Sequence, residues 1–265
     1  MNFLITSIRF LSTDNQLRSI IISSSVPAEG KSLINILLSK TFSESGKKVL
    51  LIDADLRKPQ LHYRIGINNL KGLSNIINDS KSSISEVIQT VPNYPNWDII
   101  TAGIRPPDPT RLLGSERFKQ IKKELYQANE YDLIIWDTPP LLGLADASLI
   151  AEDTDGIILL ISLAKVDRSL PKETILRAKN SGLNILGLLT NNIKDYSNPN
   201  NPYYYGTYGY GNYFPGKEYA EYANIEDDDK EVNTKSQSES DKNNINKYQS
   251  YLKTLGKRFL KWLDS

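Results

Sequence analysis

The chain has 265 residues, 39% of them hydrophobic, so it is long enough to bury a sizeable core in one α/β domain and still carry a tail. Its formal net charge of +1 argues against a global field that would recruit nucleic acid or an anionic membrane surface. The absence of cysteine excludes disulfides, thiolate metal sites and a cysteine nucleophile, and a single histidine, His62, excludes a histidine-based metal cluster.

Neither a membrane span nor a secretion signal is apparent in the sequence. The longest apolar run, "GIILLISLA", falls short of the roughly 18 residues that a membrane-spanning helix needs and fits a buried strand. The first ten residues, "MNFLITSIRF", lack both the basic start and the long apolar core of a signal peptide. We therefore expect a cytoplasmic protein.

From residue 19 onward, short β-branched apolar runs alternate with segments of helical length. Runs that are apolar throughout are typical of strands covered on both faces in a parallel sheet. This alternation predicts an α/β fold with a doubly wound, mainly parallel sheet and helices on both faces, which binds ligands beyond the carboxyl ends of its strands. The predicted strands are 19–24, 48–53, 97–103, 131–137, 156–162 and 185–191, and the predicted helices include 31–45, 115–128 and 170–181.

The C-terminal part of the chain differs in composition from the rest. The segment "NPYYYGTYGYGNYFPGKEYAEY" (201–222) contains eight of the fifteen tyrosines, and its glycines and prolines exclude a regular helix. Taken alone, it could be an adhesive low-complexity patch, an aromatic packing surface or a run of exposed phenols. Residues 223–247 are polar and charged, which predicts a disordered linker, and the apolar spacing in 248–265 predicts a basic amphipathic helix.

The segment "SVPAEGKS" (25–32) follows the first predicted strand and precedes a helix. It matches the phosphate-binding pattern G-x-x-x-x-G-K-[S/T] except that Ser25 replaces the first glycine. In such a loop the backbone N–H groups and the helix N-terminus surround phosphate oxygens. The Lys31 ammonium would approach the β- and γ-phosphates, and the Ser32 hydroxyl would bind Mg²⁺.

Acidic residues end two further predicted strands. Asp53 ends the second, followed by Asp55 and Arg57 in "DADLRKP", and Asp137 ends the fourth, in "DTPP". Each could simply cap a helix. Together with the loop they favour a Mg-nucleotide site, since phosphoryl transfer requires carboxylates that hold Mg²⁺ and accept a hydroxyl proton.

At this point the sequence resembles a known family. The segments "SVPAEGKS", "VLLIDADLRKP" and "IIWDTPP" are similar to the Walker A, Walker A′ and Walker B motifs of the bacterial tyrosine kinases of capsule and exopolysaccharide assembly, whose domain has a P-loop NTPase-like fold. The connecting segments "KGLSNII" and "TAGIRPPDPTRLLGS", and "LGLLTNN" before the tyrosine cluster, resemble that family too, so the resemblance covers residues 4 to about 214.

The resemblance implies a role for each matching residue. It implies catalytic roles for Lys31, Asp53 and Asp55, the last two assisting the tyrosine hydroxyl or the metal, and Mg²⁺ binding by Ser32, Asp55 and Asp137. Arg57 is a candidate for stabilising phosphate charge or, equally, for a structural salt bridge. The implied ATP-binding residues are Ser25, Val26, Pro27, Ala28, Glu29, Gly30, Lys31, Ser32, Leu33 and Asn191, the last against the adenine. The implied phosphoacceptors are Tyr203, Tyr204, Tyr205, Tyr208, Tyr210 and Tyr213.

The resemblance also implies partners. These are further copies of the chain in a transient homo-oligomer, a membrane adaptor that regulates polysaccharide chain length, and a cognate tyrosine phosphatase. The adaptor would recruit the kinase to the inner face of the plasma membrane. We expect residues 1–18 to be a helical remnant of the family's oligomerisation region, 19–195 to form the kinase domain and 196–222 to form the autophosphorylation tail.

Three departures from the family pattern stand out. Ala28 occupies a position that is usually glycine, Trp136 is bulky for its place before Asp137, and only "LITSIRF" remains of the N-terminal E-x-x-R-x-x-R-type signature, which puts oligomerisation through that helix in doubt.

Two other functions stay open at the level of sequence. The ATPases of cell-division positioning and plasmid partition share the Walker A′ signature, but they carry a second lysine early in the loop where this chain has Val26. A non-catalytic regulator that binds nucleotide and switches a polysaccharide polymerase is the other alternative.

Overall fold

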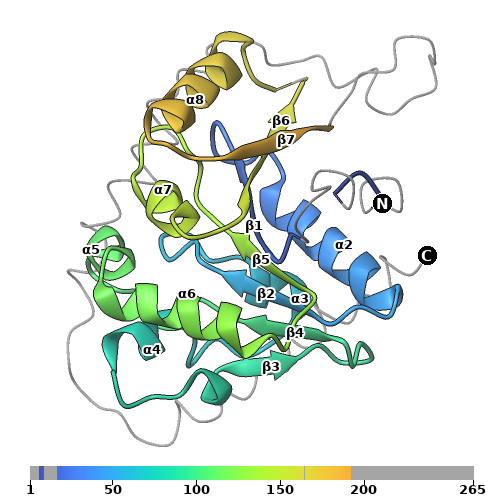
Figure 1. The fold of residues 1–265 in the computed structure, drawn as a ribbon, viewed down its shortest axis with the longest axis vertical. Helices are drawn as coiled ribbons and strands as arrows, with labels where there is room; N and C mark the ends of the chain where they lie inside the picture. Colours follow the sequence, from blue (N-terminus) through green and yellow to red (C-terminus); the bar gives the residue numbers. More distant parts are fainter. Residues whose placement is uncertain (1–5, 9–16, 164, 192–265) are drawn as a thin grey trace, which may run out of the picture.

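The computed structural model describes residues 6–8, 17–163 and 165–191, and these form one seven-stranded sheet with helices on both faces (Figure 1). The strand order is β3-β4-β2-β5-β1-β6-β7. Every neighbouring pair is parallel except β3 with β4. The strands are β1 (Ser19–Ser24), β2 (Val49–Asp53), β3 (Ile88–Thr90), β4 (Trp97–Ile100), β5 (Leu133–Asp137), β6 (Gly156–Ser162) and β7 (Ile185–Asn191). The predicted fold class is confirmed.

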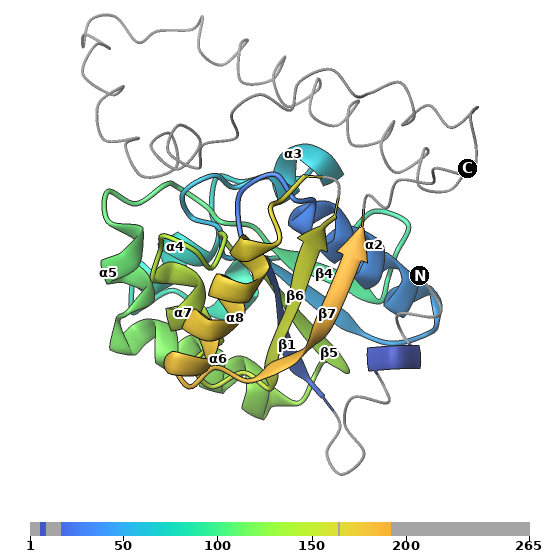
Figure 2. The same ribbon diagram turned by 90° about the horizontal axis from the view of Figure 1, so that it is seen from above.

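The helices divide between the two faces of the sheet, as Figures 1 and 2 show. Two of them, α2 (Lys31–Glu44) and α3 (Leu61–Ile65), contribute to the hydrophobic cluster on one face. The cluster on the other face lies beneath α4 (Leu73–Asn78), α5 (Pro109–Leu113), α6 (Glu116–Ala128), α7 (Asp146–Ala151) and α8 (Ser169–Asn180), with a 3₁₀ turn, η1 (Ile84–Glu86), before β3.

Strand side chains alternate strictly between the two clusters. In β1, Ile21 packs under the helices of the larger group, whereas Ile20 and Ile22 face α2. This alternation is the period of two that a pleated strand imposes, and it uses a continuous apolar run to fill both sides. The expectation of strands covered on both faces is thus confirmed for the central strands, where all residues of β1, β2, β5 and β6 are buried.

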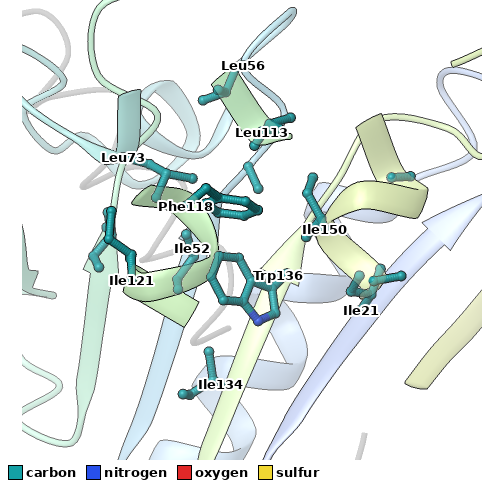
Figure 3. Packing of buried hydrophobic residues seen from close by; sticks show 14 of the residues in the cluster. Ile21, Ile52, Leu56, Leu73, Leu113, Phe118, Ile121, Ile134, Trp136 and Ile150 are labelled. Carbon is teal, nitrogen blue, oxygen red and sulfur yellow. The ribbon is translucent and has the colours of Figure 1, made fainter. Parts of the chain in front are cut away.

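Trp136 lies at the centre of the larger cluster (Figure 3). It is 1% exposed, and its ring meets the edge of Phe118 at a centroid distance of 5.8 Å. Its indole Nε1 donates to Ser19 Oγ at 3.0 Å. The bulky residue before Asp137 is therefore accommodated on the face of the sheet opposite α2, with its one polar atom satisfied.

The sequence prediction missed several short elements. The antiparallel strand β3 has three residues, and each of the short helices α3, α4, α5 and α7 has five or six. Elements this short do not show a hydrophobic period in the sequence. Residues 185–191 form the predicted strand, but β7 is only partly buried because, within the described residues, it pairs on one side alone.

Most of the predicted segments outside the sheet cannot be compared with the structure. The tail 196–222, the linker 223–247 and the helix 248–265 lie outside the described residues, as does most of 1–18. Within the part that is described, no helix is long and apolar enough to cross a membrane.

Candidate functional site

The loop from Ser25 to Gly30 joins β1 to α2 at the carboxyl edge of the sheet. Two of its residues have positive φ, Gly30 at 101° and Ala28 at 59°. Glycine adopts such angles freely, whereas alanine is strained by roughly 1–2 kcal/mol. The loop therefore keeps its left-handed turn at Ala28 despite the missing glycine, which is strain of the kind found at functional sites.

The side chains of the loop mostly face the protein. Val26 and Pro27 are buried and Ala28 is exposed, so a bound phosphate would meet their backbone rather than their side chains. Ser25, at the position of the first glycine, is fully buried, and its Oγ lies 2.8 Å from the hydroxyl of Thr174 on α8. The serine thus attaches the start of the loop to a helix, an interaction that glycine could not make.

Glu29 holds the loop in shape. Its side chain is 2% exposed, and its two carboxylate oxygens accept the backbone N–H groups of Val26 (2.8 Å) and Ser162 (2.9 Å). Asn191, at the end of β7, donates from Nδ2 to the carbonyl of Glu29 at 2.9 Å. Glu29 was predicted among the ATP-binding residues, and in this structure its carboxylate binds the protein itself.

Lys31 and Ser32 begin α2, with Leu33, half-buried, following them. The Lys31 ammonium donates to Ser24 Oγ at 3.1 Å and is 6% exposed. Burial lowers its pKa, an effect opposed by the nearby carboxylates of Asp55, Asp137 and Glu29. A buried cation at a helix N-terminus is a suitable partner for a polyphosphate.

The predicted carboxylates converge. Asp53 and Asp137 are register partners at the ends of the adjacent strands β2 and β5, and both are almost fully buried. Asp53 Oδ2 accepts the backbone N–H groups of Gln60 and Leu61 at 3.2 and 3.1 Å. Asp55, 6% exposed, accepts the Lys58 N–H.

These groups influence each other's ionisation. Burial, and then the charges of Asp137 and Asp55, hold the pKa of Asp53 well above its usual range. Burial raises the pKa of Asp137 to about 6, against the hydrogen bond from Ser32 and the charge of Lys31. The Lys31 ammonium alone does not balance the three carboxylates, and a bound cation would neutralise excess negative charge there.

Buried polar atoms without partners gather at the same place. In the described part of the chain, six buried side-chain atoms lack a hydrogen bond, and four of them border the loop or the ends of β2, β5 and β7: Asn35 Oδ1, Asp53 Oδ1, Thr138 Oγ1 and Asn191 Oδ1. Unsatisfied buried groups are rare in folded proteins, so a concentration of them favours a polar ligand at this site.

The residues fit Mg²⁺ bound together with a nucleotide. No group of three or more acidic or histidine side chains within the described ranges could hold a metal on its own. Mg²⁺ is typically bound by one or two carboxylates, phosphate oxygens and water, so a protein cage is not needed. Asp55, Asp137 and the Ser32 hydroxyl would supply the protein ligands, directly or through water, and the bound ion would neutralise developing phosphate charge.

Sequence reasoning missed Asn35 beside the site, and for Arg57 it left open a role at the phosphates or in a salt bridge. Asn35 of α2 donates from Nδ2 to Asp137 Oδ1 at 2.6 Å. Arg57 donates from Nε to Asp146 Oδ2 at 2.6 Å and from Nη2 to Thr110 Oγ1 at 2.8 Å. Neither contact has a local signal in the sequence, because Asp137 lies 102 residues from Asn35 and the partners of Arg57 lie 53 and 89 residues away.

Comparison with known proteins identifies the family of this chain. Residues 17–168 match the family model described as an AAA domain. The tyrosine-protein kinase YwqD of Bacillus subtilis is 39% identical over 205 residues, covering 76% of this chain and 83% of the relative. The chain belongs to the bacterial tyrosine kinase family. The solved kinase domain of the Escherichia coli tyrosine kinase ETK superposes with a TM-score of 0.70 at 28% identity, over 80% of this chain and 78% of that domain.

The bacterial tyrosine kinases share their fold with positioning ATPases. The MinC:MinD complex of Aquifex aeolicus matches with a TM-score of 0.56 at 17% identity, over 67% of this chain, a likeness that extends to the fold alone. The predicted phosphoacceptor tyrosines lie outside the described residues.

Proposed function

We propose that the chain is an ATP-dependent protein-tyrosine autokinase that regulates the polymerisation and export of a capsular or extracellular polysaccharide. The main observation in support of this proposal is that Lys31 and the carboxylates of Asp53, Asp55 and Asp137 lie together at one edge of the sheet. Membership of the bacterial tyrosine kinase family and the name of the relative YwqD support it.

In the proposed reaction the phenol oxygen of a tyrosine forms a bond to the γ-phosphorus of ATP. The bond from that phosphorus to the bridging oxygen breaks, and ADP leaves. Asp53 accepts the phenol proton through Oδ1, the carboxylate oxygen that has no hydrogen-bond partner in the described part of the chain. Lys31 and the loop N–H groups balance charge on the phosphates, which is the main requirement of phosphoryl transfer.

The acceptors in this proposal are tyrosines of a neighbouring copy. β7 ends at Asn191, whose side chain contacts the phosphate loop, and the tyrosine cluster begins only at Tyr203. The last described strand thus ends beside the site, and in this proposal the tyrosines that follow it in sequence enter the site of a neighbouring copy. The acceptors are Tyr203, Tyr204, Tyr205, Tyr208, Tyr210 and Tyr213.

The remaining partners follow from the same proposal. A transient homo-oligomer brings tail and site of different copies together. A membrane adaptor that controls polysaccharide chain length recruits the kinase to the inner face of the plasma membrane, and a cognate tyrosine phosphatase reverses the modification.

The test is phosphotyrosine formation by the purified chain in Mg-ATP, with adaptor added if the chain alone is slow. Lys31→Met should lower labelling about 100-fold or more, because the buried charge that faces the phosphates is lost. Asp53→Ala and Asp137→Ala should behave similarly. Lys40→Met is the matched control, since Lys40 is also a buried lysine of α2 but pairs with Glu44 at 3.4 Å.

Each outcome discriminates between functions. Equal labelling of Lys31→Met and wild type would show that the loop is wrongly assigned. Tight ATP binding without any phosphotyrosine, with adaptor present, would instead favour the non-catalytic regulator.

A further inference from the structure

Asn35 is a buried amide on α2 that touches the Walker B carboxylate. It is 0% exposed, and its Nδ2 donates to Asp137 Oδ1 at 2.6 Å across 102 residues of sequence. We propose that Asn35 is a positioning residue that orients Asp137 toward Mg-nucleotide. The inference rests on the proposed function and extends it to a residue outside the three motifs.

The amide has only one possible orientation. Its Oδ1 has no hydrogen-bond partner among the described residues, so the bond to Asp137 determines which way the side chain is turned. A reversed amide would bring its oxygen against the carboxylate oxygen, and two acceptors repel. Within the described ranges the Asn35–Asp137 bond is therefore the single hydrogen bond of this side chain, and a buried acceptor is left unsatisfied to make it.

Asp137 is held by two groups of the same helix, and they differ in what they can do. The Ser32 hydroxyl also hydrogen-bonds to Asp137, and it is the group that would coordinate Mg²⁺. An amide NH₂ offers no lone pair to a metal, so Asn35 keeps its bond to Asp137 whether or not Ser32 is engaged elsewhere. This division of roles assigns the metal to Ser32 and the constant orientation of Asp137 to Asn35.

Residues that hold metal-linked carboxylates typically affect metal affinity as well as activity. The decisive measurement is therefore the gain in ADP affinity that Mg²⁺ provides. A fluorescent ADP analogue is titrated into wild type, Asn35→Leu and Asn35→Ala, in excess Mg²⁺ and in excess EDTA. Leucine keeps the branched shape of the side chain and alanine avoids overpacking, and both remove the donor.

We expect the Mg²⁺-dependent gain in affinity to fall about 10-fold or more in both variants, with affinity in EDTA within about twofold of wild type. Ser39→Ala is the matched control. Ser39 is also fully buried on α2, and its hydroxyl donates to the Asn35 backbone carbonyl at 2.8 Å. This control should keep the full gain from Mg²⁺.

Three results would overturn the proposal: affinities equal to wild type both with and without Mg²⁺, an equal loss of affinity with and without Mg²⁺, or failure of both variants to fold in a thermal melt. The last two would assign Asn35 a purely structural role. The proposed function fails separately, since a wild type that binds Mg-ADP but forms no phosphotyrosine would leave this assignment intact.

Discussion

Replacing Asp146 with alanine should destabilise the protein strongly, because it leaves the Arg57 guanidinium without its anion. Asp146 is 1% exposed and accepts from Arg57 Nε at 2.6 Å, from Nη2 at 3.3 Å and from the Thr110 hydroxyl at 2.6 Å. Breaking a buried ion pair by removing one partner costs about 3–5 kcal/mol. The Arg57 side chain is 16% exposed, so water can reach part of it and the lower value, about 3 kcal/mol, applies.

The assay is urea unfolding, with the thermal midpoint as a second measure. A loss of about 3 kcal/mol corresponds to a fall of roughly 6–12 °C in a domain of this size. Glu44→Ala is the comparison, because Glu44 pairs with Lys40 with its side chain 47% exposed, and such pairs contribute about 0.2–1 kcal/mol. A loss below about 1 kcal/mol for Asp146→Ala would refute the reasoning, and it would return Arg57 to the alternative role of stabilising phosphate charge.

Two further predictions concern pH and packing. Burial lowers the pKa of His62 from 6.5 to about 4, so between these pH values the imidazole is protonated in the unfolded chain but not in the folded one. Wild type should therefore lose stability relative to His62→Gln as pH falls from 6.5 to about 4. The raised pKa of Asp53 has the opposite effect on stability as pH falls, but it is present in both proteins, so their urea midpoints should be compared at each pH. Parallel curves of urea midpoint against pH for wild type and His62→Gln would contradict the prediction. Gly72→Ala should lower the free energy of unfolding in urea by about 3 kcal/mol or more, since an added Cβ would lie 2.1 Å from the Thr101 carbonyl oxygen. Gly114→Ala is the control: the nearest atom beyond its chain neighbours would lie 3.4 Å from its Cβ, so its loss should stay within about 1 kcal/mol. Equal losses in the two variants would contradict this prediction.

The parts of the fold that sequence could predict are those with a repeated pattern. Apolar runs such as 19–24 and 156–162 predicted the central strands because a strand covered on both faces has no polar position. Their carboxyl ends then placed Asp53 and Asp137 at one edge, and the structure pairs these two residues in register. Lys31 and Ser32 could also be predicted, because the phosphate-loop motif and the start of the helix after it lie in one short stretch of sequence.

The remaining features depend on contacts that have no local signature. Glu29 was assigned to the ligand because it lies within the motif, but its carboxylate reaches Ser162 on β6, 133 residues away. In the sequence, Asn35 is one polar residue of a predicted helix, and nothing near it indicates that its side chain donates to Asp137 at the end of β5. Such pairings follow from the order of strands in the sheet, which apolar periodicity does not determine.

The structure of the phosphate loop indicates that its shape is set before any phosphate arrives. Glu29 uses its carboxylate to fix Val26 from within the loop and Ser162 from β6, while Asn191 holds the Glu29 carbonyl from β7. These contacts maintain Ala28 at a φ of 59°, which an alanine in a free loop would rarely adopt. A loop already held in the binding conformation loses little entropy when an anion enters, and its dipoles need no reorganisation during phosphoryl transfer. The strain at Ala28 is thus compensated by contacts from two neighbouring strands, β6 through Ser162 and β7 through Asn191.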